Sequence, residues 1–246
     1  MSIDYDYKRN PHSLGSPRAA LPIILAERKP ESLLDVGCGN GTWLKAALEL
    51  GVTSILGVDG VAIASDEFLV PQDFFRKQDL SAPLDFGRKF DLVLCLEVAE
   101  HLEAENSETL IQSLVRHSDF IVFSAACPGQ PGQHHVNCRW PDYWQRLFNK
   151  VGFACEDSLR WRLWNQREVE PWYRQNVFSA YRDPAGAGME KRIEAVIHPD
   201  LLPLLNEEAC VAYTRKIEAG CLPAKWYAGT CFSAFRAKTR KRLTRG

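Results

Sequence analysis

The chain alternates short apolar runs with amphipathic helical patterns over its first half. The runs have the length and the β-branched and aromatic content of strands buried on both faces. Helical patterns lie at residues 18–28, with Ser16 as a candidate N-cap and Pro17 in the first turn, and at residues 42–50. The predicted strands cover residues 33–36, 54–59, 74–78, 90–96 and 120–126. This alternation predicts an α/β fold with a mostly parallel sheet and helices on both faces.

The second half predicts a further helix and two further strands. Gly and Pro residues mark a loop at residues 128–133. An apolar stripe of Tyr143, Trp144, Leu147 and Phe148 predicts a helix over residues 141–151, closed by Gly152. The two further strands are predicted at residues 158–164 and 176–181.

The domain organisation follows from the Gly- and Pro-rich linker at residues 183–188. Residues 1–182 are expected to form one domain, which opens with a loose leader at residues 1–16. Residues 183–246 are expected to form a small helical extension, and its helical part, residues 189–235, has breaks at Pro199, Pro203 and Gly220.

A glycine-rich loop follows the first predicted strand. Its residues are Asp35, Gly37, Cys38, Gly39, Asn40 and Gly41. Glycine tolerates positive φ and lets a ligand approach the backbone, and the next helix offers unpaired N–H groups at its N-terminus. A dinucleotide site has the spacing G-x-G-x-x-G, whereas this loop has G-x-G-x-G. Because Asp35 would repel a pyrophosphate, the loop favours a ligand that carries an ammonium group.

The segment LLDVGCGNG, residues 33–41, resembles the first motif of class I methyltransferases that use S-adenosylmethionine (SAM). This resemblance implies a Rossmann-like, seven-stranded, mostly parallel sheet whose last two strands form an antiparallel hairpin at one edge. It also implies SAM as the cofactor. The alternative interpretation is a tight strand–helix turn without a ligand.

Further candidate cofactor contacts lie at the ends of the next strands, and they are Asp59, Gly60, Asp79, Leu80, Leu96 and Glu97. An acidic residue about 20 positions beyond such a loop is placed to hold ribose hydroxyls, which is the role expected of Asp59. In the resembled family an acid at the position of Asp79 accepts from the adenine amino group. Each acid alone could equally be a helix cap or a solvated turn residue.

Candidate catalytic residues follow the fourth predicted strand. If residues 97–102 open a helix, Glu97, Glu100 and His101 share one face, and His134 or His135 follows the fifth strand at the same edge of the sheet. Two carboxylates and two imidazoles, from Glu97, Glu100, His101 and His135, would suit Mg²⁺ or Mn²⁺. Without a metal, His101 or His135 is the candidate general base, and Glu100 belongs to the same catalytic set.

This E-x-x-E-H stretch with a later histidine is similar to that of small-RNA 3′-end 2′-O-methyltransferases, in which a divalent ion grips the ribose hydroxyls. Ubiquinone-pathway O-methyltransferases carry a similar stretch. Two structural interpretations stay open, because Glu97 could stabilise a helix N-terminus and His101 could be a hydrogen-bonded core histidine.

A segment rich in Arg and aromatic residues is the candidate substrate wall. Its proposed contacts are Arg162, Trp164, Trp172, Tyr173 and Arg174. Trp and Arg together suit a sugar face, an aromatic ring or an anion. The alternative is an edge hairpin packed by the C-terminal helices, with guanidinium groups reaching to water.

The remaining composition narrows the class of partner. The net charge of −1 gives no global attraction to nucleic acid, although residues 236–245 are basic. The eight cysteines have no C-x-x-C spacing, and no apolar run is long enough for a membrane span. Taken with the resemblance to SAM-dependent methyltransferases, this composition leads us to expect a cytoplasmic enzyme that methylates a hydroxyl of a small polar acceptor. An RNA 2′-O-methyltransferase and an N-methyltransferase are the alternatives, and the oligomeric state stays open.

Overall fold

The computed structural model describes residues 5, 13–26, 28–206, 215–216, 219, 221, 223–225 and 227–228. The chain divides into a compact unit, Met1–Leu202, and a second unit, Pro203–Gly246. The basic tail at residues 236–245 and most of the leader at residues 1–16 lie outside the described residues. Within them, no helix is long and apolar enough to cross a membrane.

The described residues form a seven-stranded sheet in the order β3-β2-β1-β4-β5-β7-β6. The strands are β1 (Ser32–Val36), β2 (Ser54–Asp59), β3 (Phe75–Lys77), β4 (Leu92–Leu96), β5 (Phe120–Ser124), β6 (Phe153–Glu156) and β7 (Phe178–Arg182). The first five strands pair in parallel, and β7 runs antiparallel to both β5 and β6. The strand order reverses between β1 and β4, and open α/β sheets bind ligands outside the carboxyl ends of strands at such a point. The expected fold class is confirmed.

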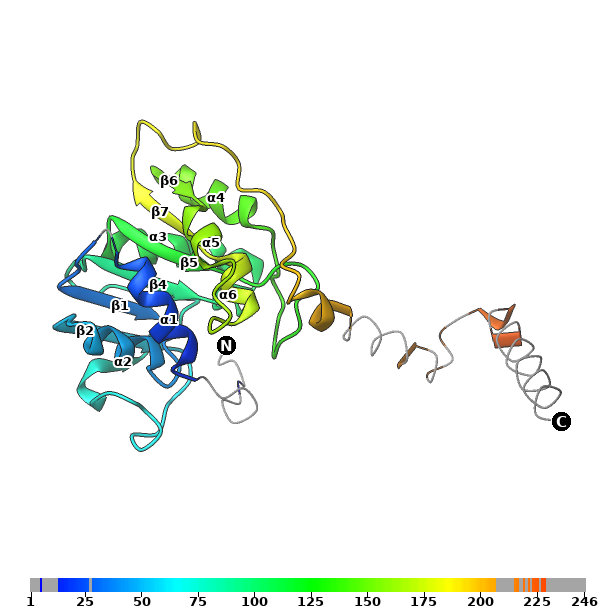
Figure 1. The fold of residues 1–246 in the computed structure, drawn as a ribbon, viewed down its shortest axis with the longest axis horizontal. Coiled ribbons are helices and arrows are strands. Elements are labelled where there is room, and N and C mark those ends of the chain that lie inside the picture. The colour runs from blue at the N-terminus through cyan, green and yellow to red at the C-terminus, as the bar shows by residue number, and fades with distance from the viewer. Residues whose placement is uncertain are drawn as a thin grey trace. The chain divides into compact units, whose positions relative to one another are not determined.

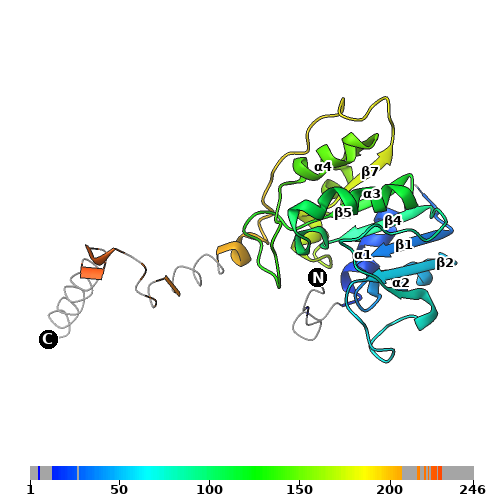
Figure 2. The ribbon, with the colours of Figure 1, turned by 180° about the vertical axis from the view of Figure 1, so that it is seen from behind.

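Helices cover both faces of the sheet (Figures 1 and 2). They are α1 (Gly15–Ile24), α2 (Thr42–Glu49), α3 (Ser107–His117), α4 (Pro141–Lys150), α5 (Ser158–Leu163) and α6 (Pro171–Asn176). Single 3-10 turns lie at η1 (Gln72–Phe74), η2 (Ala99–His101) and η3 (Ala104–Asn106). Residues of α3 and α4 pack in one hydrophobic core, and residues of α1, α2, α5 and α6 pack in the other.

The central strand β4 shows why the apolar runs predicted strands well. Leu92, Leu94 and Leu96 pack into the core beside α1 and α2, whereas Val93 and Cys95 pack into the core beside α3 and α4. Because successive side chains of a strand point to opposite faces, a strand covered on both faces must be apolar at every position.

Three expectations about secondary structure are wrong. Residues 158–164 form helix α5 instead of a strand, and the edge strand is β6 at residues 153–156. The helical spacing of Leu159 and Leu163, both buried in one core, explains α5. Residues 97–102 contain a single 3-10 turn, Ala99–His101, rather than the start of an α-helix, and α3 begins only at Ser107. Residues 190–198 contain no helix.

The compact unit also extends past the boundary expected after residue 182. The Glu190 carboxylate accepts hydrogen bonds from Gln145 Nε2 (2.9 Å) and Asn149 Nδ2 (2.7 Å). The N–H of Ile193 donates to Gln145 Oε1 at 2.9 Å, and the Ile193 side chain belongs to the core. The first twenty or so residues of the expected extension therefore pack on the fold, and the boundary lies after Leu202.

Candidate functional site

The glycine loop has a left-handed backbone at each of its three glycines. Gly37, Gly39 and Gly41 have φ of 80°, 50° and 81°. The N–H groups of Gly37 and Cys38 both donate to the carbonyl of Val58, at 2.8 and 3.1 Å. These bonds fix the loop to the end of β2, next to Asp59, the last residue of that strand.

The space above Gly37 is filled by the protein itself. A Cβ atom on Gly37 would lie 2.2 Å from Cγ2 of Val98, and one on Gly41 would lie 2.9 Å from the ring of Phe68. The sequence suggested that these glycines leave room for a ligand. At Gly37 the close neighbour is instead the turn that carries Glu97 and Glu100.

Asp35 is the buried acid of the loop. Its side chain is 2% exposed, and Oδ2 has no hydrogen-bond partner among the described residues. Burial, and secondarily the nearby Asp59 carboxylate, raises the pKa of Asp35 to about 8. A ligand ammonium group would supply the missing partner and the missing positive charge. This chemistry fits the methionine part of SAM.

Asp59 shapes the loop from the end of β2. Its Oδ2 accepts from the N–H of Gly39 and its Oδ1 from the N–H of Val61, at 2.9 and 2.8 Å. Gly60 lies between these contacts, and a Cβ there would meet only the carbonyl oxygen of Gln78, at 3.9 Å. The carboxylate therefore orders the segment where a ribose is expected.

The expected adenine contacts lie beyond β3. Oδ1 of Asp79 accepts from the N–H and the hydroxyl of Ser81, at 2.9 and 2.6 Å, and Leu80 is buried. These two bonds lower the pKa of Asp79. Asn40, back in the glycine loop, has a buried Oδ1 that no described residue satisfies. The turn geometry of Asp79 matches the capping alternative, whereas Asn40 keeps an unused acceptor.

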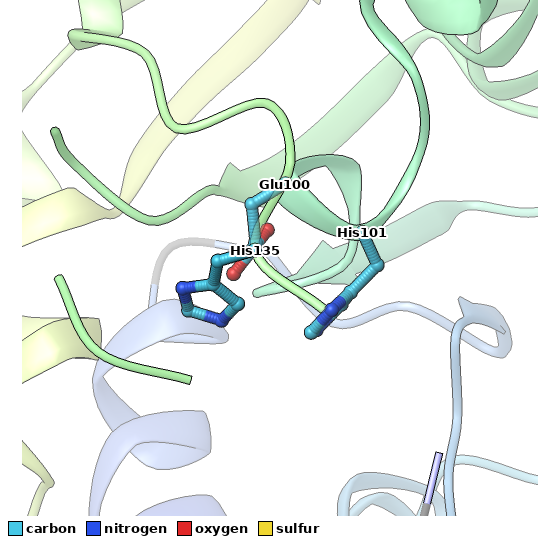
Figure 3. A group of neighbouring side chains, drawn as sticks. All are labelled: Glu100, His101 and His135. Atoms are coloured by element: carbon cyan, nitrogen blue, oxygen red, sulfur yellow. The ribbon is translucent and has the colours of Figure 1, made fainter. Parts of the chain in front are cut away.

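Glu100, His101 and His135 form the candidate catalytic cluster. One ligand-type atom from each lies within 4.8 Å of the others. Figure 3 shows the two imidazole rings and the Glu100 carboxylate converging from the turn after β4 and the loop after β5. The ring centroids of the histidines are 5.0 Å apart. The structure brings His135 into this group, rather than its neighbour His134.

Backbone bonds hold the two segments of the cluster together. The N–H groups of Val136 and Asn137 donate to the carbonyl of Glu100, at 2.9 and 3.0 Å. The Nδ1 atom of His135 lies 3.0 Å from the carbonyl of Gln130. Because a carbonyl only accepts, Nδ1 carries the proton, and in the neutral ring Nε2 carries the lone pair. A Cβ on Gly132 would lie 2.0 Å from that Nε2, so this glycine makes room for the ring.

Burial shifts the pKa values of two residues of the cluster. Glu100 is fully buried, and neither carboxylate oxygen makes a hydrogen bond of normal geometry to a described residue. Burial and the Glu97 carboxylate raise the pKa of Glu100, although nearby backbone N–H groups of Glu100 and Ala126 oppose this. Burial and the neighbouring His135 lower the pKa of His101 to about 4, so this imidazole is neutral at pH 7.

Glu97 lies beside this cluster and outside the group of three. It adopts φ of 56°, and its carboxylate accepts from Gln130 Nε2 at 2.6 Å and from Asn176 Nδ2 at 3.1 Å. The expected four-residue metal set is thus reduced to Glu100, His101 and His135, because two amides occupy Glu97.

The expected substrate wall is divided in the structure. Arg162 Nη2 donates to the carbonyl of Ile23, the Trp164 ring lies 4.3 Å from that of His198, and Arg174 is buried. Arg174 donates to Asp200 and to the carbonyl of Trp164, at 2.9 and 3.3 Å. Arg162 thus joins α5 to α1, and Arg174 joins α6 to the residue after α5, whereas Trp164 packs on His198.

Tyr173 and Trp172 lie closer to the cofactor loop. The Tyr173 ring contacts Trp43, which belongs to the helix after the glycine loop, edge-on at 5.3 Å, and Trp172 lies 6.1 Å from Tyr173. Burial, with Glu97 and Glu170 nearby, raises the pKa of Tyr173. Of the predicted wall, this pair is the part that borders the site.

Sequence reasoning missed three side chains of the site. Gln130 and Asn176 bind Glu97, and the ring of Tyr5 lies edge-on to His101 with centroids 5.3 Å apart. Gln130 and Asn176 carry no periodic or motif signal, because their partners are distant in sequence. Tyr5, from the leader, therefore lies beside the candidate site.

The chain is similar in sequence to known methyltransferases. A family model described as a methyltransferase domain matches residues 7–175 of the chain. The chain is 36% identical over 93 residues to a ubiquinone biosynthesis O-methyltransferase of Methylobacterium nodulans, a match that covers 35% of this chain and 34% of the relative. It is 27% identical over 184 residues to a tRNA U34 carboxymethyltransferase of Pseudomonas savastanoi pv. phaseolicola, a match that covers 64% of this chain and 56% of the relative.

The chain thus spans about a third of the first relative and about half of the second. Among solved structures, the sugar N-methyltransferase KedS8 of Streptoalloteichus sp ATCC 53650 has a TM-score of 0.54 at 16% identity. The superposition covers 74% of this chain and 97% of that one. At such low identity the likeness shows the fold alone.

Proposed function

The chain belongs to the family of SAM-dependent class I methyltransferase domains, and from this premise we propose that it transfers the methyl group of SAM to a hydroxyl of a small polar acceptor, such as a sugar or another diol. The convergence of Glu100, His101 and His135 at the carboxyl edge of the sheet carries this proposal. A hydroxyl must lose a proton as its oxygen attacks the methyl, and the cluster offers neutral imidazole for that task. SAM itself brings the activated methyl group.

The same residues fit a divalent cation. The Glu100 oxygens and Nδ1 of His101 are buried without partners, and His135 is oriented through Nδ1 by a carbonyl, as metal-binding histidines commonly are. Two imidazoles and one carboxylate suit Mn²⁺ and similar transition ions better than Mg²⁺, which prefers oxygen donors. Such an ion would lower the pKa of an acceptor hydroxyl and orient its oxygen.

Without an ion, the protein residues alone support proton removal. His101 is neutral at pH 7, because burial and His135 hold its pKa near 4. The Nε2 atom of His135 is an acceptor, because its Nδ1–H group donates a hydrogen bond to the Gln130 carbonyl. Glu100 would then stabilise the charge that develops on a neighbouring imidazole.

Two other acceptor classes have a specific observation in their favour. The relative that matches the longer part of this chain is a tRNA U34 carboxymethyltransferase, which favours an RNA acceptor. A norajmaline N-methyltransferase of Rauvolfia serpentina is 28% identical to this chain over 116 residues, which favours a small amine. The likeness to a ubiquinone O-methyltransferase and the histidine–carboxylate cluster support a small hydroxyl as the leading acceptor.

The test uses the full chain and methyl-labelled SAM with three acceptor panels: small diols and sugars, short RNA, and small amines. Each panel is run in chelator, with Mn²⁺ restored and with Mg²⁺ restored. Glu100→Gln is compared with Glu103→Gln, which changes an exposed acid three residues away.

We expect label in a small diol, lost in chelator and restored by Mn²⁺, with Glu100→Gln reducing turnover about 100-fold or more and Glu103→Gln unchanged. Label that survives the chelator would retain O-methylation and exclude the metal. Label confined to RNA or to amines would replace the proposed acceptor.

A further inference from the structure

Two buried amides, Gln130 and Asn176, connect the elements that carry the candidate site. Gln130 lies in the loop after β5, and Asn176 is the last residue of α6. Gln130 donates through Nε2 to Oε2 of Glu97 (2.6 Å) and accepts through Oε1 from Nδ2 of Asn176 (2.9 Å). Its backbone carbonyl accepts from Nδ1 of His135 (3.0 Å). One residue thus contacts both the acid and the imidazole.

Asn176 completes the arrangement from the other side. Its Nδ2 donates to Oε1 of Glu97 (3.1 Å), and its Oδ1 accepts from Nε2 of Gln175 (3.0 Å). Oε1 of Gln175 in turn accepts from the N–H of His198 (2.7 Å). Each amide in this series of hydrogen bonds has one orientation. Every amide N–H donates to an oxygen of the next side chain, and the series ends at the Glu97 carboxylate, which only accepts.

We propose that Gln130 and Asn176 are positioning residues for methyl transfer, which hold the Glu97 carboxylate and the His135 ring in one arrangement beside Glu100. This inference rests on the proposed function of the Glu100, His101 and His135 cluster. It adds two side chains that bind Glu97 directly and act on the reacting groups only through Glu97 and His135.

The backbone supports this role. Glu97 has φ of 56°, a conformation that costs free energy for a residue with a side chain, and its N–H is held by the carbonyl and hydroxyl oxygens of Ser124. Such strain persists where the surroundings over-determine it. Partners of a site residue typically change affinity or activity 10- to 100-fold when they are removed.

The test uses the full chain with Gln130→Glu and Asn176→Asp, which keep the shape but place an acceptor against Glu97. Gln145→Glu is the matched control. Gln145 is fully buried and donates to the Glu190 carboxylate at 2.9 Å, on α4 and away from the site. Two quantities are measured: the imidazole ¹⁵N resonances of His135, which need no acceptor, and the kcat of methyl transfer beside the Kd of SAM.

We expect Gln130→Glu and Asn176→Asp to lower kcat about 10- to 100-fold while the Kd of SAM changes less than about threefold. We expect Gln130→Glu also to shift the His135 resonances. Gln145→Glu should lower the melting temperature and leave the other quantities unchanged. If the Gln130 and Asn176 variants behave like Gln145→Glu, the positioning role is overturned.

The two proposals fail separately. If the His135 resonances shift but no hydroxyl acceptor is methylated, the acceptor is wrong and the positioning of His135 stands. If a hydroxyl is methylated and Gln130→Glu keeps the wild-type kcat, the function stands and the positioning role falls.

Discussion

Left-handed backbone is confined, among the described non-glycine residues, to the candidate site. Among the described non-glycine residues, Glu97 and His134 are the two with positive φ, at 56° and 53°. Both flank the Glu100, His101 and His135 cluster, and Val98 after Glu97 packs directly over Gly37 of the cofactor loop. Strained residues persist where neighbouring structure fixes them, and they concentrate at functional sites. The turn after β4 therefore connects the glycine loop to the candidate catalytic cluster.

The contact of Val98 with Gly37 gives the first prediction. Gly37→Ala combines a strained φ of 80° with a Cβ 2.2 Å from Val98, so it should abolish SAM binding and lower the free energy of unfolding by more than the ~1–3 kcal/mol of the backbone alone. Gly51→Ala is the control, because Gly51 has φ of 92° and open space around it. Chemical denaturation and calorimetry measure both. Equal losses of unfolding free energy in the two variants would mean that Val98 moves aside at little cost.

Asp35 gives the second prediction, which concerns pH. Its pKa is raised to about 8 in the folded protein, above the ~3.9 of an unfolded chain. The folded state therefore binds the extra proton between about pH 4 and about pH 8, and the stability contributed by Asp35 is lost as pH rises through that window. A ligand ammonium favours the ionised carboxylate, so SAM binding should tighten over the same rise.

Asp35→Asn separates this effect from other titrations. We expect the variant to be increasingly more stable than wild type as pH rises from about 5 to about 8, and to bind SAM weakly at every pH. Urea titrations and calorimetry over about pH 6 to 7.5, where the ligand amine stays largely protonated, measure both effects. A stability difference that is constant with pH would contradict the raised pKa.

At the scale of the element, sequence patterns predicted strands better than turns. Leu92–Leu96 is apolar at every position because both faces are covered, and this signal is local to the strand. In the segment 158–163 the apolar residues Leu159, Trp161 and Leu163 alternate with arginines, as in a strand. Its buried residues are instead Leu159, Arg160 and Leu163, which follow a helical period. Gln130 gave no signal, because a polar loop residue acquires its role only from contacts that the fold makes.

Helix α6 carries the third prediction, which separates a structural from a substrate role for Arg174. This buried guanidinium donates to the Trp164 carbonyl and to Asp200. Arg174→Ala should therefore lower the free energy of unfolding by about 2 kcal/mol or more, because it removes hydrogen bonds from a charged donor and leaves a cavity where a buried side chain packed. Asp200→Ala should cost less than about 1 kcal/mol, because this acid is largely exposed.

Thermal and urea unfolding test this pair, with the KM for the methyl acceptor as a second readout. If Arg174→Ala unfolds like wild type but loses acceptor binding, the guanidinium contacts substrate, as the sequence alone suggested. If Asp200→Ala matches Arg174→Ala, the ion pair rather than the buried carbonyl bonds stabilises the end of α6.

At the scale of the whole molecule, residues 183–202 connect α4 to α6 within the compact unit that carries the candidate site. Glu190 and Ile193 hold Gln145 of α4, and His198 and Asp200 hold Gln175 and Arg174 of α6. This segment contains little regular structure, so the sequence pattern placed it in a separate extension. Its hydrogen bonds reach, through Gln175 and Asn176, to Glu97 at the candidate site.

The fourth prediction compares two truncated chains. A chain of residues 1–182 leaves both amide atoms of the fully buried Gln145 without partners and removes Ile193 and Leu201 from the core. Unsatisfied buried polar groups and lost apolar burial each cost about 1–3 kcal/mol. A difference of this size should lower the melting temperature by roughly 10 °C or more, or prevent folding. A chain of residues 1–202 keeps these contacts and should melt within a few degrees of the full chain. Circular dichroism and SAM-binding calorimetry decide between them, and a stable, SAM-binding 1–182 chain would show that the segment only decorates the fold.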